Sequence, residues 1–146
     1  MIGLLQRVTS ASVAVDGKTV GEIGRGLLVL VGVRAGDAEA QSERLLDKLL
    51  GYRVFPDDAG KMNQSLRDVG GGLLLVPQFT LAADTSSGMR AGFSTAAAPP
   101  RAKALFEHLV ARAKREWPQT ATGIFGANMQ VSLVNDGPVT FWLEAR

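Results

Sequence analysis

The end of the chain, VNDGPVTFWLEAR, places a glycine and a proline between two runs that otherwise favour β-strands. These runs are MQVSLV and VTFWLE, and both are rich in β-branched and aromatic residues. Asp136-Gly137 alone would be an ordinary signal for a tight hairpin. Pro138 lacks an N–H and has φ fixed at roughly −65°, which such a turn does not need. The segment therefore predicts two strands joined by an unusual backbone conformation.

Strand signals also dominate the rest of the chain. The further expected strands are residues 2–8, the two runs within residues 10–24, residues 26–33 and residues 72–81. Asp16-Gly17 predicts a hairpin between the two runs of residues 10–24. Residues 53–71 are rich in turn signals, and residues 82–100 predict a long polar loop of the kind that is usually functional or mobile.

Two segments carry apolar residues at helical spacing. In residues 37–52, Asp37 suits the N-cap and Gly51 suits the end of the helix. Residues 100–117 predict a second helix that ends near Pro118. The predicted fold is α+β, with mainly antiparallel β-sheets that form a barrel-like core and two main helices packed on one side.

The size and composition predict one domain that spans residues 1–146. Of these 146 residues 46% are hydrophobic, which is enough for one core and too little for two. No window approaches the ~18 uncharged apolar residues of a membrane span. Arg7 interrupts the first apolar run, which therefore predicts a strand and not a signal peptide. We expect a cytoplasmic protein that does not enter a membrane.

The composition also excludes several kinds of active site. Without cysteine the chain has no thiol nucleophile and no thiolate–zinc site. His108 is the single histidine, so a multi-histidine metal site is excluded. The formal net charge of 16 − 14 = +2 permits an RNA partner without requiring one.

Three local features admit a functional and a plainer interpretation. Gly70–Gly72 precede a strand and lack the Lys-Ser/Thr pair of a phosphate loop, which favours a turn. His108 stands beside Glu107 in the second predicted helix with no nucleophile near it, which favours a surface position. The basic residues of that helix are accompanied by Glu107 and Glu116, which favours a solvated face over an RNA contact.

Gln78 and Thr80 are polar residues at the end of a very apolar strand, where Pro77 interrupts the hydrogen-bond ladder. Polar groups that emerge where a buried strand meets a long loop suit a functional site on a rigid support. An ordinary strand end explains the same pattern equally well.

Four blocks of the sequence resemble the D-aminoacyl-tRNA deacylase family: QRVTSASV, GYRVFPDDAGKMN, PQFTLAADTSSGMRAGFS and NMQVSLVNDGPVTFWL. They occur in the family's order over essentially the whole chain, and the Gly-Pro after SLVND is the most specific of them. The resemblance implies an enzyme that hydrolyses the ester bond of D-aminoacyl-tRNA, and of glycyl-tRNA, as chiral proofreading in translation. It also implies a homodimer that uses no metal or organic cofactor.

The resemblance assigns the chiral filter to Gly137-Pro138. Their peptide bond is expected to be cis and to reach across the homodimer interface into the partner's active site. Arg7 is expected to hydrogen-bond near this loop and to lock its orientation, which suits a guanidinium with its five fixed donors.

The resemblance assigns the catalytic half of the site to Gln78, Phe79 and Thr80. Backbone N–H groups around Phe79 and Thr80 are expected to hold the developing oxyanion of the ester carbonyl. The terminal 2′-hydroxyl of the tRNA is expected to assist or position water, because no base that could activate Thr80 is adjacent in the sequence. Phe125 and Met129 are expected to line the pocket for the 3′-terminal adenosine.

Pro77 departs from the family pattern, which usually has serine at this place. Proline occurs there in a related group with relaxed chirality, which acts on certain L-alanyl-tRNAs and has a trans Gly-Pro. Phe79, Arg7 and the intact NDGPVT favour the D-specific activity. Deacylation of mischarged L-alanyl-tRNA and a non-catalytic RNA-binding module remain the alternatives.

Overall fold

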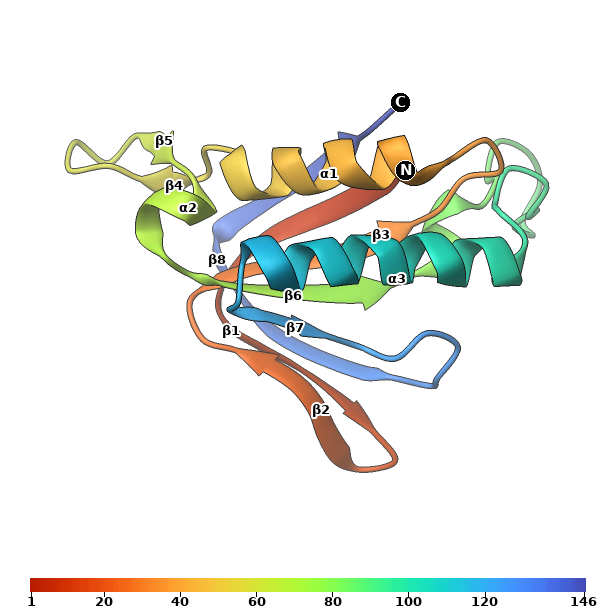
Figure 1. Ribbon diagram of the computed structural model, residues 1–146, viewed down its shortest axis with the longest axis horizontal. Helices are drawn as coiled ribbons and strands as arrows, with labels where there is room; N and C mark the ends of the chain where they lie inside the picture. Colours follow the sequence, from red (N-terminus) through yellow and green to blue (C-terminus); the bar gives the residue numbers. More distant parts are fainter.

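A computed structural model describes residues 1–146 and contains a six-stranded mixed sheet that curls into a nearly closed barrel (Figure 1). Its strands are β1 (Ile2–Val15), β2 (Lys18–Ile23), β3 (Gly26–Gly32), β6 (Gly72–Pro77), β7 (Thr120–Thr122) and β8 (Gln130–Glu144). Along one edge β1 pairs with β8, and along its other edge residues 2–8 pair with β3 and residues 11–15 with β2. The long first strand therefore belongs to both halves of the barrel.

The barrel closes where β2 comes next to β7. A Cβ atom at Gly21 would lie only 2.6 Å from the carbonyl oxygen of Thr122. This approach is possible only because Gly21 has no side chain.

The predicted hairpin at Asp16-Gly17 is confirmed. β1 and β2 are antiparallel, and Asp16 and Gly17 have φ of 50° and 77°. Positive φ at both central residues is typical of a type I′ turn, whose twist matches that of the strands. The prediction of mainly antiparallel pairing also holds for all three partners of β1, whereas β6 lies parallel to β3 and β7.

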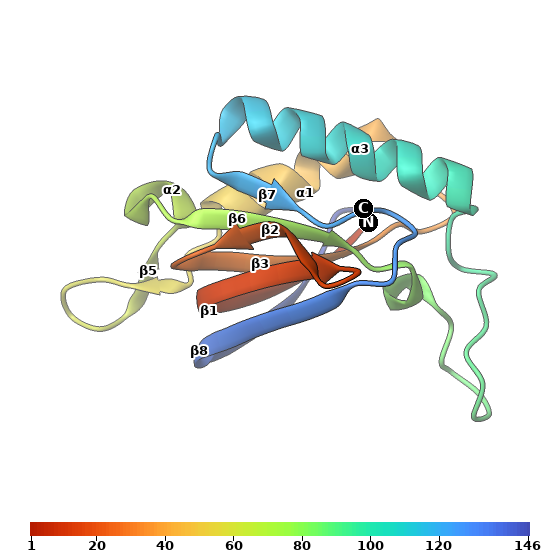
Figure 2. The ribbon, with the colours of Figure 1, turned by 90° about the horizontal axis from the view of Figure 1, so that it is seen from below.

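The parallel pairs arise because each is connected through a helix, as parallel strands require. Helices α1 (Glu39–Gly51) and α3 (Pro99–Glu116) lie side by side on one face of the sheet, as predicted, and β8 lies on the other side (Figure 2). The buried face of α1 and that of α3 complete the main core, with side chains of Leu45, Leu46, Leu49, Leu50, Leu105, Phe106 and Leu109. Neither these helices nor any other in the structure combines the length and apolarity that a membrane span requires.

The turn-rich residues 53–71 contain three small elements that the sequence did not predict. They are β4 (Phe55–Pro56), β5 (Met62–Gln64) and the one-turn helix α2 (Leu66–Val69). Ser65 caps α2, and Gly70 ends it in the left-handed conformation with φ of 67°. Gly70 and Gly71 therefore form the expected turn, and Gly72 is already the first residue of β6.

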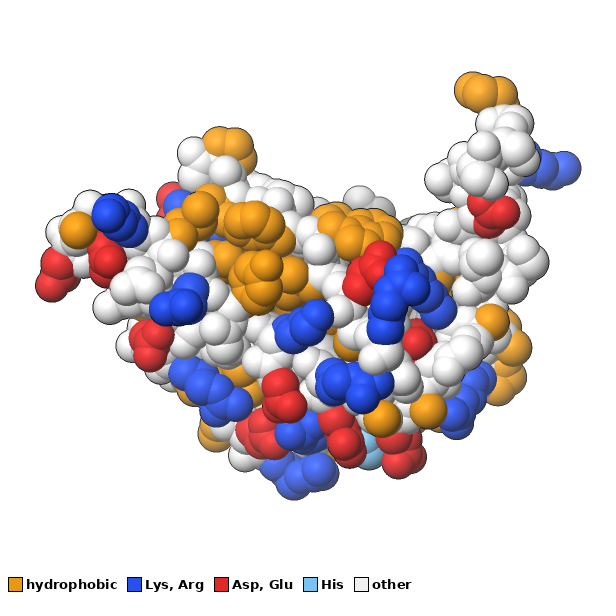
Figure 3. Space-filling view, turned by 90° about the horizontal axis from the view of Figure 1, so that it is seen from above, with side chains coloured by type: hydrophobic (Ala, Val, Ile, Leu, Met, Phe, Trp, Pro, Cys, Tyr) orange, Lys and Arg blue, Asp and Glu red, His pale blue; other side chains and the backbone are white.

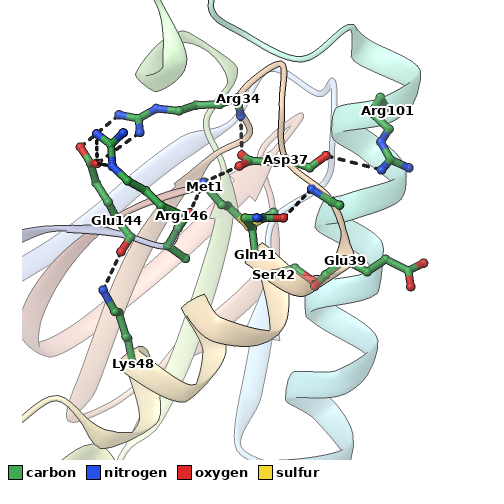
Figure 4. A network of polar contacts seen from close by, with 12 residues as sticks. Met1, Arg34, Asp37, Glu39, Gln41, Ser42, Lys48, Arg101, Glu144 and Arg146 are labelled. Atoms are coloured by element: carbon green, nitrogen blue, oxygen red, sulfur yellow. Dashed lines mark hydrogen bonds and ion pairs between the residues drawn. The ribbon is translucent and has the colours of Figure 1, made fainter.

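Asp37 was expected to be the N-cap of the first helix, and this was wrong. The N-cap is Ala38, whose N–H donates to the side-chain oxygen of Gln41 at 2.8 Å. The Asp37 carboxylate instead accepts from the α-amino group of Met1 at 2.7 Å and from the N–H of Arg34 at 2.7 Å (Figure 4). Burial lowers the pKa of that amino group, although its contact with Asp37 opposes the shift.

Two predicted strand boundaries were also wrong. Residues 72–81 were expected to be one strand, but β6 ends at Pro77 and the 3₁₀-helix η1 (Phe79–Ala82) follows. Residues 123–144 were expected to hold two strands, but β8 continues through Gly137-Pro138 and pairs with β1 on both sides of this peptide. Gly137-Pro138 therefore lie in an interruption of the β1–β8 pairing and not in a turn between two separate strands.

The end of β8 is fixed by an ion-pair network around Glu144 (Figure 4). The Arg34 guanidinium donates two hydrogen bonds to the Glu144 carboxylate, at 3.0 and 3.2 Å, and Arg146 approaches it at 2.7 Å. Lys48 of α1 donates to the backbone carbonyl of Glu144 at 2.6 Å. The hydrogen bonds from Arg34, and then those from Trp142 and Arg146, lower the pKa of the Glu144 carboxyl from 4.5 to about 2.

A lowered carboxyl pKa predicts a stability contribution that is present above pH ~4.5 and lost as the pH falls toward 2. We expect Glu144→Gln to unfold at lower urea concentration than the parent protein at pH 7, and this difference to shrink by pH 2.5. Urea midpoints at pH 7, 4 and 2.5 measure it. The control is Glu107→Gln, which removes an exposed i,i+4 pair with Lys103. An equal deficit of Glu144→Gln at pH 7 and pH 2.5 would contradict the prediction.

Candidate active site

The first half of the candidate site is the turn that follows β6. Pro77 is the last residue of the strand, and the N–H of Gln78 makes one more bond to β3, to the carbonyl of Val31 at 2.8 Å. The chain then tightens into η1, where the N–H of Leu81 donates to the carbonyl of Gln78 at 3.2 Å. The turn is therefore attached to the buried sheet at its first residue.

Gly32 at the end of β3 makes room for this turn. A Cβ atom at Gly32 would lie 3.0 Å from Cβ of Leu81 and 3.3 Å from the nitrogen of Ala82. These distances are tighter than ordinary packing, so a side chain at Gly32 would push η1 away from the sheet. The position of η1 thus depends on a glycine that is remote in sequence.

The N–H groups of Phe79 and Thr80 are the first two of η1. The opening N–H groups of a helix have no acceptor within the helix. Neither group donates to any turn, loop or cap acceptor either. Two adjacent main-chain donors are therefore free to bind an oxygen atom that carries negative charge.

The Gln78 side chain donates from Nε2 to Oγ1 of Thr80 at 2.6 Å. This bond occupies a lone pair of the Thr80 hydroxyl and leaves its proton free to donate elsewhere. An amide N–H cannot accept that proton, so the contact orients the hydroxyl without activating it as a nucleophile. The geometry supports positioning as the role of Thr80.

Two adjoining cavities flank the Phe79 ring. The first, of about 290 Å³, is lined by Val76, Pro77, Gln78, Phe79, Thr80, Gly126, Ala127, Met129 and Val131. The second, of about 260 Å³, is lined by Pro77, Phe79, Pro99, Phe125 and Gly126. The structure therefore brings five predicted residues together, and no ionisable side chain lines either cavity.

Met129 is held in this region by the loop that leads into β8. Its sulfur lies 3.4 Å from the nitrogen of Ile124, and a Cβ atom at Gly123 would lie 2.7 Å from that sulfur. Gly123 also lies against the Pro77 ring. The loop of residues 123–129 is therefore packed directly on the end of β6.

The second half of the candidate site is a bulge in β8. Gln6 pairs with Thr140 and Val8 pairs with Asn135, so residues 136–139 have only Arg7 opposite them. Gly137 has φ of 141°, and its peptide bond to Pro138 is cis, the isomer that the resemblance implies.

Arg7 and Asn135 hold the bulge from its two sides. Arg7 donates from Nε to the carbonyl of Asp136 at 2.9 Å and from Nη1 to the carbonyl of Val54 at 2.6 Å. The Asn135 side chain accepts from the N–H of Val139 at 2.8 Å and donates to the Thr140 hydroxyl at 2.8 Å. The contact expected between Arg7 and the Gly-Pro loop is therefore present in the structure.

The two halves lie apart within one chain. Arg7 pairs with Leu27 near the start of β3, whereas η1 packs on Gly32 at its end. At ~3.3 Å per residue these levels are about 17 Å apart. The bulge lies near the β4–β5 hairpin and η1 at the opposite end of the barrel (Figure 1). A single chain does not bring Gly137-Pro138 to Thr80.

The remaining sequence candidate, His108, lies outside both halves. Its ring faces Glu39 and Glu43 of α1, at 3.9 and 3.4 Å. The half-buried ring thus lies at the rim between α1 and α3. No group of three or more His, Asp or Glu side chains in the chain could hold a metal ion.

Two residues that the geometry brings into the site were not among those predicted from the sequence. One is Asn135, which belongs to the NDGPVT block. Its side-chain amide donates one hydrogen bond and accepts another, and both bonds hold the bulge. Phe93, in the predicted long loop, stacks on Phe79 with ring centroids 5.1 Å apart. No periodic pattern in the sequence marks either residue.

Comparison with known proteins gives matches over nearly the whole chain. A family model described as D-Tyr-tRNA(Tyr) deacylase matches residues 4–144. The D-aminoacyl-tRNA deacylase of Thioalkalivibrio sulfidiphilus is 66% identical over 99% of this chain and 97% of its own length. That of Alkalilimnicola ehrlichii is 63% identical over 100% of this chain and 97% of its own length.

Two solved structures share the fold. The c-Myc DNA Unwinding Element Binding Protein superimposes with a TM-score of 0.95 at 36% identity, over 100% of this chain and 99% of the other. A probable eukaryotic D-amino acid tRNA deacylase superimposes with a TM-score of 0.83 at 18% identity, over 98% of each chain.

Arg7→Ala should loosen the bulge, because it leaves two carbonyls without their donor. We expect a loss of about 1–3 kcal/mol in the free energy of unfolding and faster hydrogen exchange at the N–H of Val139. Urea unfolding and amide exchange measure the two effects. Arg53→Ala is the control, since it removes one exposed bond, to Asn63 at 3.1 Å. Equal stability of the two variants would contradict the role given to Arg7.

Proposed function

Because the chain belongs to the D-Tyr-tRNA(Tyr) deacylase family, we propose that it hydrolyses the ester bond of D-aminoacyl-tRNA and releases free D-amino acid and tRNA. Glycyl-tRNA is a second expected substrate. The observation that carries the proposal is the pair of free N–H groups at Phe79 and Thr80 beside a cavity without ionisable side chains. Acting on aminoacyl-tRNA places the protein in the cytoplasm.

The two N–H groups would stabilise the transition state of ester hydrolysis. Water adds to the ester carbonyl carbon, and negative charge develops on the carbonyl oxygen. Two fixed main-chain donors bind that oxygen more strongly as its charge grows, which lowers the barrier. Collapse of the intermediate breaks the bond to the ribose oxygen, which leaves as the hydroxyl of the tRNA after it takes a proton.

The proton acceptor for water would come from the substrate. No His, Asp, Glu or Lys lines the cavity, and the Thr80 hydroxyl is already bonded to Gln78. The neighbouring 2′-hydroxyl of the terminal ribose can hydrogen-bond the attacking water and pass on its proton. Thr80, with its free O–H, would orient the water or the 2′-hydroxyl.

The adjoining aromatic cavity suits the terminal adenosine. Phe125 lines it together with Phe79 and two prolines, and a purine can stack on such apolar faces. Met129 was expected to line the adenosine pocket together with Phe125, but it lines the neighbouring cavity, where the aminoacyl group would lie. The aminoacyl ester would then reach the free N–H groups next to Phe79.

A second copy of the chain would complete the site as a homodimer. The edge of β8 that faces away from β1 pairs with no other strand, and Val134 and Trp142 on this strand are 56% and 49% exposed. Long exposed apolar edges are usually covered in native proteins. Hydrophobic side chains gather along the upper edge of the molecule, whereas the opposite side is mostly charged (Figure 3).

A two-fold axis through this face would place each end of the barrel in one copy against the opposite end of the barrel in the other copy. The partner's Gly137-Pro138 would then lie against the cavity at Thr80. There it would form a wall of main chain beside the substrate Cα and exclude an L side chain. A ten-thousandfold preference requires about 5.5 kcal/mol, which a clash with a rigidly held backbone exceeds. Glycine has no side chain and therefore would not clash with this main-chain wall.

Hydrolysis of D-tyrosyl-tRNA and L-tyrosyl-tRNA tests the function directly. We expect release of tyrosine from the D-substrate only, measured in single-turnover assays with purified protein. Equal rates on both substrates would contradict chiral selection. Binding of the acceptor end without turnover would support an RNA-binding module. Faster hydrolysis of L-alanyl-tRNA than of D-tyrosyl-tRNA would support the relaxed activity and would trace to Pro77.

Mixed dimers test whether the site is shared. Gly137→Val damages one half, since a Cβ atom there would lie 2.7 Å from Cγ2 of Val139 and 3.1 Å from Nη2 of Arg7. The double change Gln78→Ala and Thr80→Ala damages the other half. A heterodimer purified through two different tags should regain about half of the parent activity, because one of its two sites is intact.

Each homodimer of the two variants should be clearly less active than the heterodimer. Activity of the heterodimer equal to the mean of the two homodimers would contradict a site shared between copies. A parent protein that is fully active and sediments as a monomer would also contradict a shared site.

A further inference from the structure

We infer that Phe93 is a positioning residue for the proposed oxyanion-binding turn, and that it acts through Phe79. The two rings stack at a centroid distance of 5.1 Å with 23° between their planes. Phe79 supplies one of the two free N–H groups, and together with Pro77 and Gly126 it lines both cavities. This inference rests on the proposed function and adds a residue to its machinery.

Phe93 belongs to an arm, residues 84–97, that projects from the end of the barrel near η1 (Figure 2). Asp84 and Gly92 close the arm with two backbone hydrogen bonds, at 2.8 and 2.9 Å. Beyond them, Met89 at the tip is fully exposed. The arm thus has a solvated tip and a closed base, and Phe93 directly follows the base.

The residues that follow Phe93 attach the arm to the same elements that carry η1. The N–H of Ala97 donates to the carbonyl of Val33 at 3.0 Å, and the N–H of Ala35 donates to the carbonyl of Thr95 at 3.0 Å. The Thr95 hydroxyl donates to the carbonyl of Ala82, the last residue of η1, at 2.7 Å. η1 therefore lies between Gly32 beneath it and the arm beside it.

The exposure of Phe93 argues against a role in the core alone. The residue is 44% exposed, and the residues that form the small cluster around η1 do not include it. A half-exposed ring that stacks on an active-site ring restricts the rotation of that ring. Because Phe79 is the first residue of η1, its ring and its N–H move together when the turn shifts.

The test compares Phe93→Ala with Phe93→Tyr, Phe93→Leu and Met89→Ala. Substrates are D-tyrosyl-tRNA and the fragment 3′-O-(D-tyrosyl)adenosine, which has no RNA body. We expect Phe93→Ala to lower kcat about five- to tenfold on both substrates, with a smaller change in KM and an unchanged melting temperature. Phe93→Tyr should retain activity, Phe93→Leu should resemble Phe93→Ala, and Met89→Ala should match the parent protein.

A double-mutant cycle shows whether Phe93 acts through Phe79. If it does, Phe79→Ala combined with Phe93→Ala loses no more activity than Phe79→Ala alone. Additive losses would overturn the inference, as would parent-like kcat of Phe93→Ala. A loss confined to the full tRNA would overturn it too, because it would mean that the arm contacts RNA directly.

Amide measurements separate this inference from the proposed function. Phe93→Ala should change the chemical shifts and speed up the hydrogen exchange of the Phe79 and Thr80 N–H groups, whereas Met89→Ala should not. If the parent protein hydrolyses neither substrate, the proposed function fails, and the amide data alone decide whether Phe93 positions the turn. Unchanged amide signals in Phe93→Ala would overturn the inference whatever the activity.

Discussion

The antiparallel pairing of β1 with β8 is the interaction on which the rest of the structure depends. It joins the two ends of the sequence, from Ile2 with Glu144 to Ala14 with Gln130. The other edge of β1 holds β3 and β2, so every strand of the barrel is attached directly or indirectly to this pair. The register of the pair shifts between Gln6 and Val8, where the bulge of residues 136–139 arises, and again between Val8 and Ser10.

The structure makes its candidate site from main chain. At one end of the barrel, η1 presents two free N–H groups above Gly32. At the other end, side chains of Arg7 and Asn135 bind backbone groups and so fix the shape of the bulge. The polar side chains at both ends thus mainly orient backbone or one another, and in our proposal backbone groups and the substrate supply the chemistry.

The sequence predicted the parts of the fold that local patterns determine. Asp16-Gly17 forms the expected turn, and the helical spacing of Leu45, Leu46, Leu49 and Leu50 marks the buried face of α1. Predictions failed where a distant segment decides the outcome. Asp37 binds the amino group of Met1 and is not a cap, and β8 remains one strand because β1 pairs with both of its halves.

The same distinction holds for the candidate site. The resemblance placed Gln78, Phe79, Thr80 and Met129, which the structure brings to one cavity. It did not find Asn135 or Phe93, because their contacts depend on the bulge and on the arm, which only the folded chain creates. It also could not show that Gly32 makes room for η1.

A pair of main-chain donors has a consequence for how such a protein tolerates change over generations. Every amino acid except proline carries the same N–H, so replacement of Phe79 or Thr80 alters the walls of the cavity and leaves the donors in place. Random substitution at these two positions would therefore weaken substrate binding long before it removed either N–H donor. Replacement of Gly32 would be different, because any side chain there would crowd Leu81 and Ala82 and displace the turn itself.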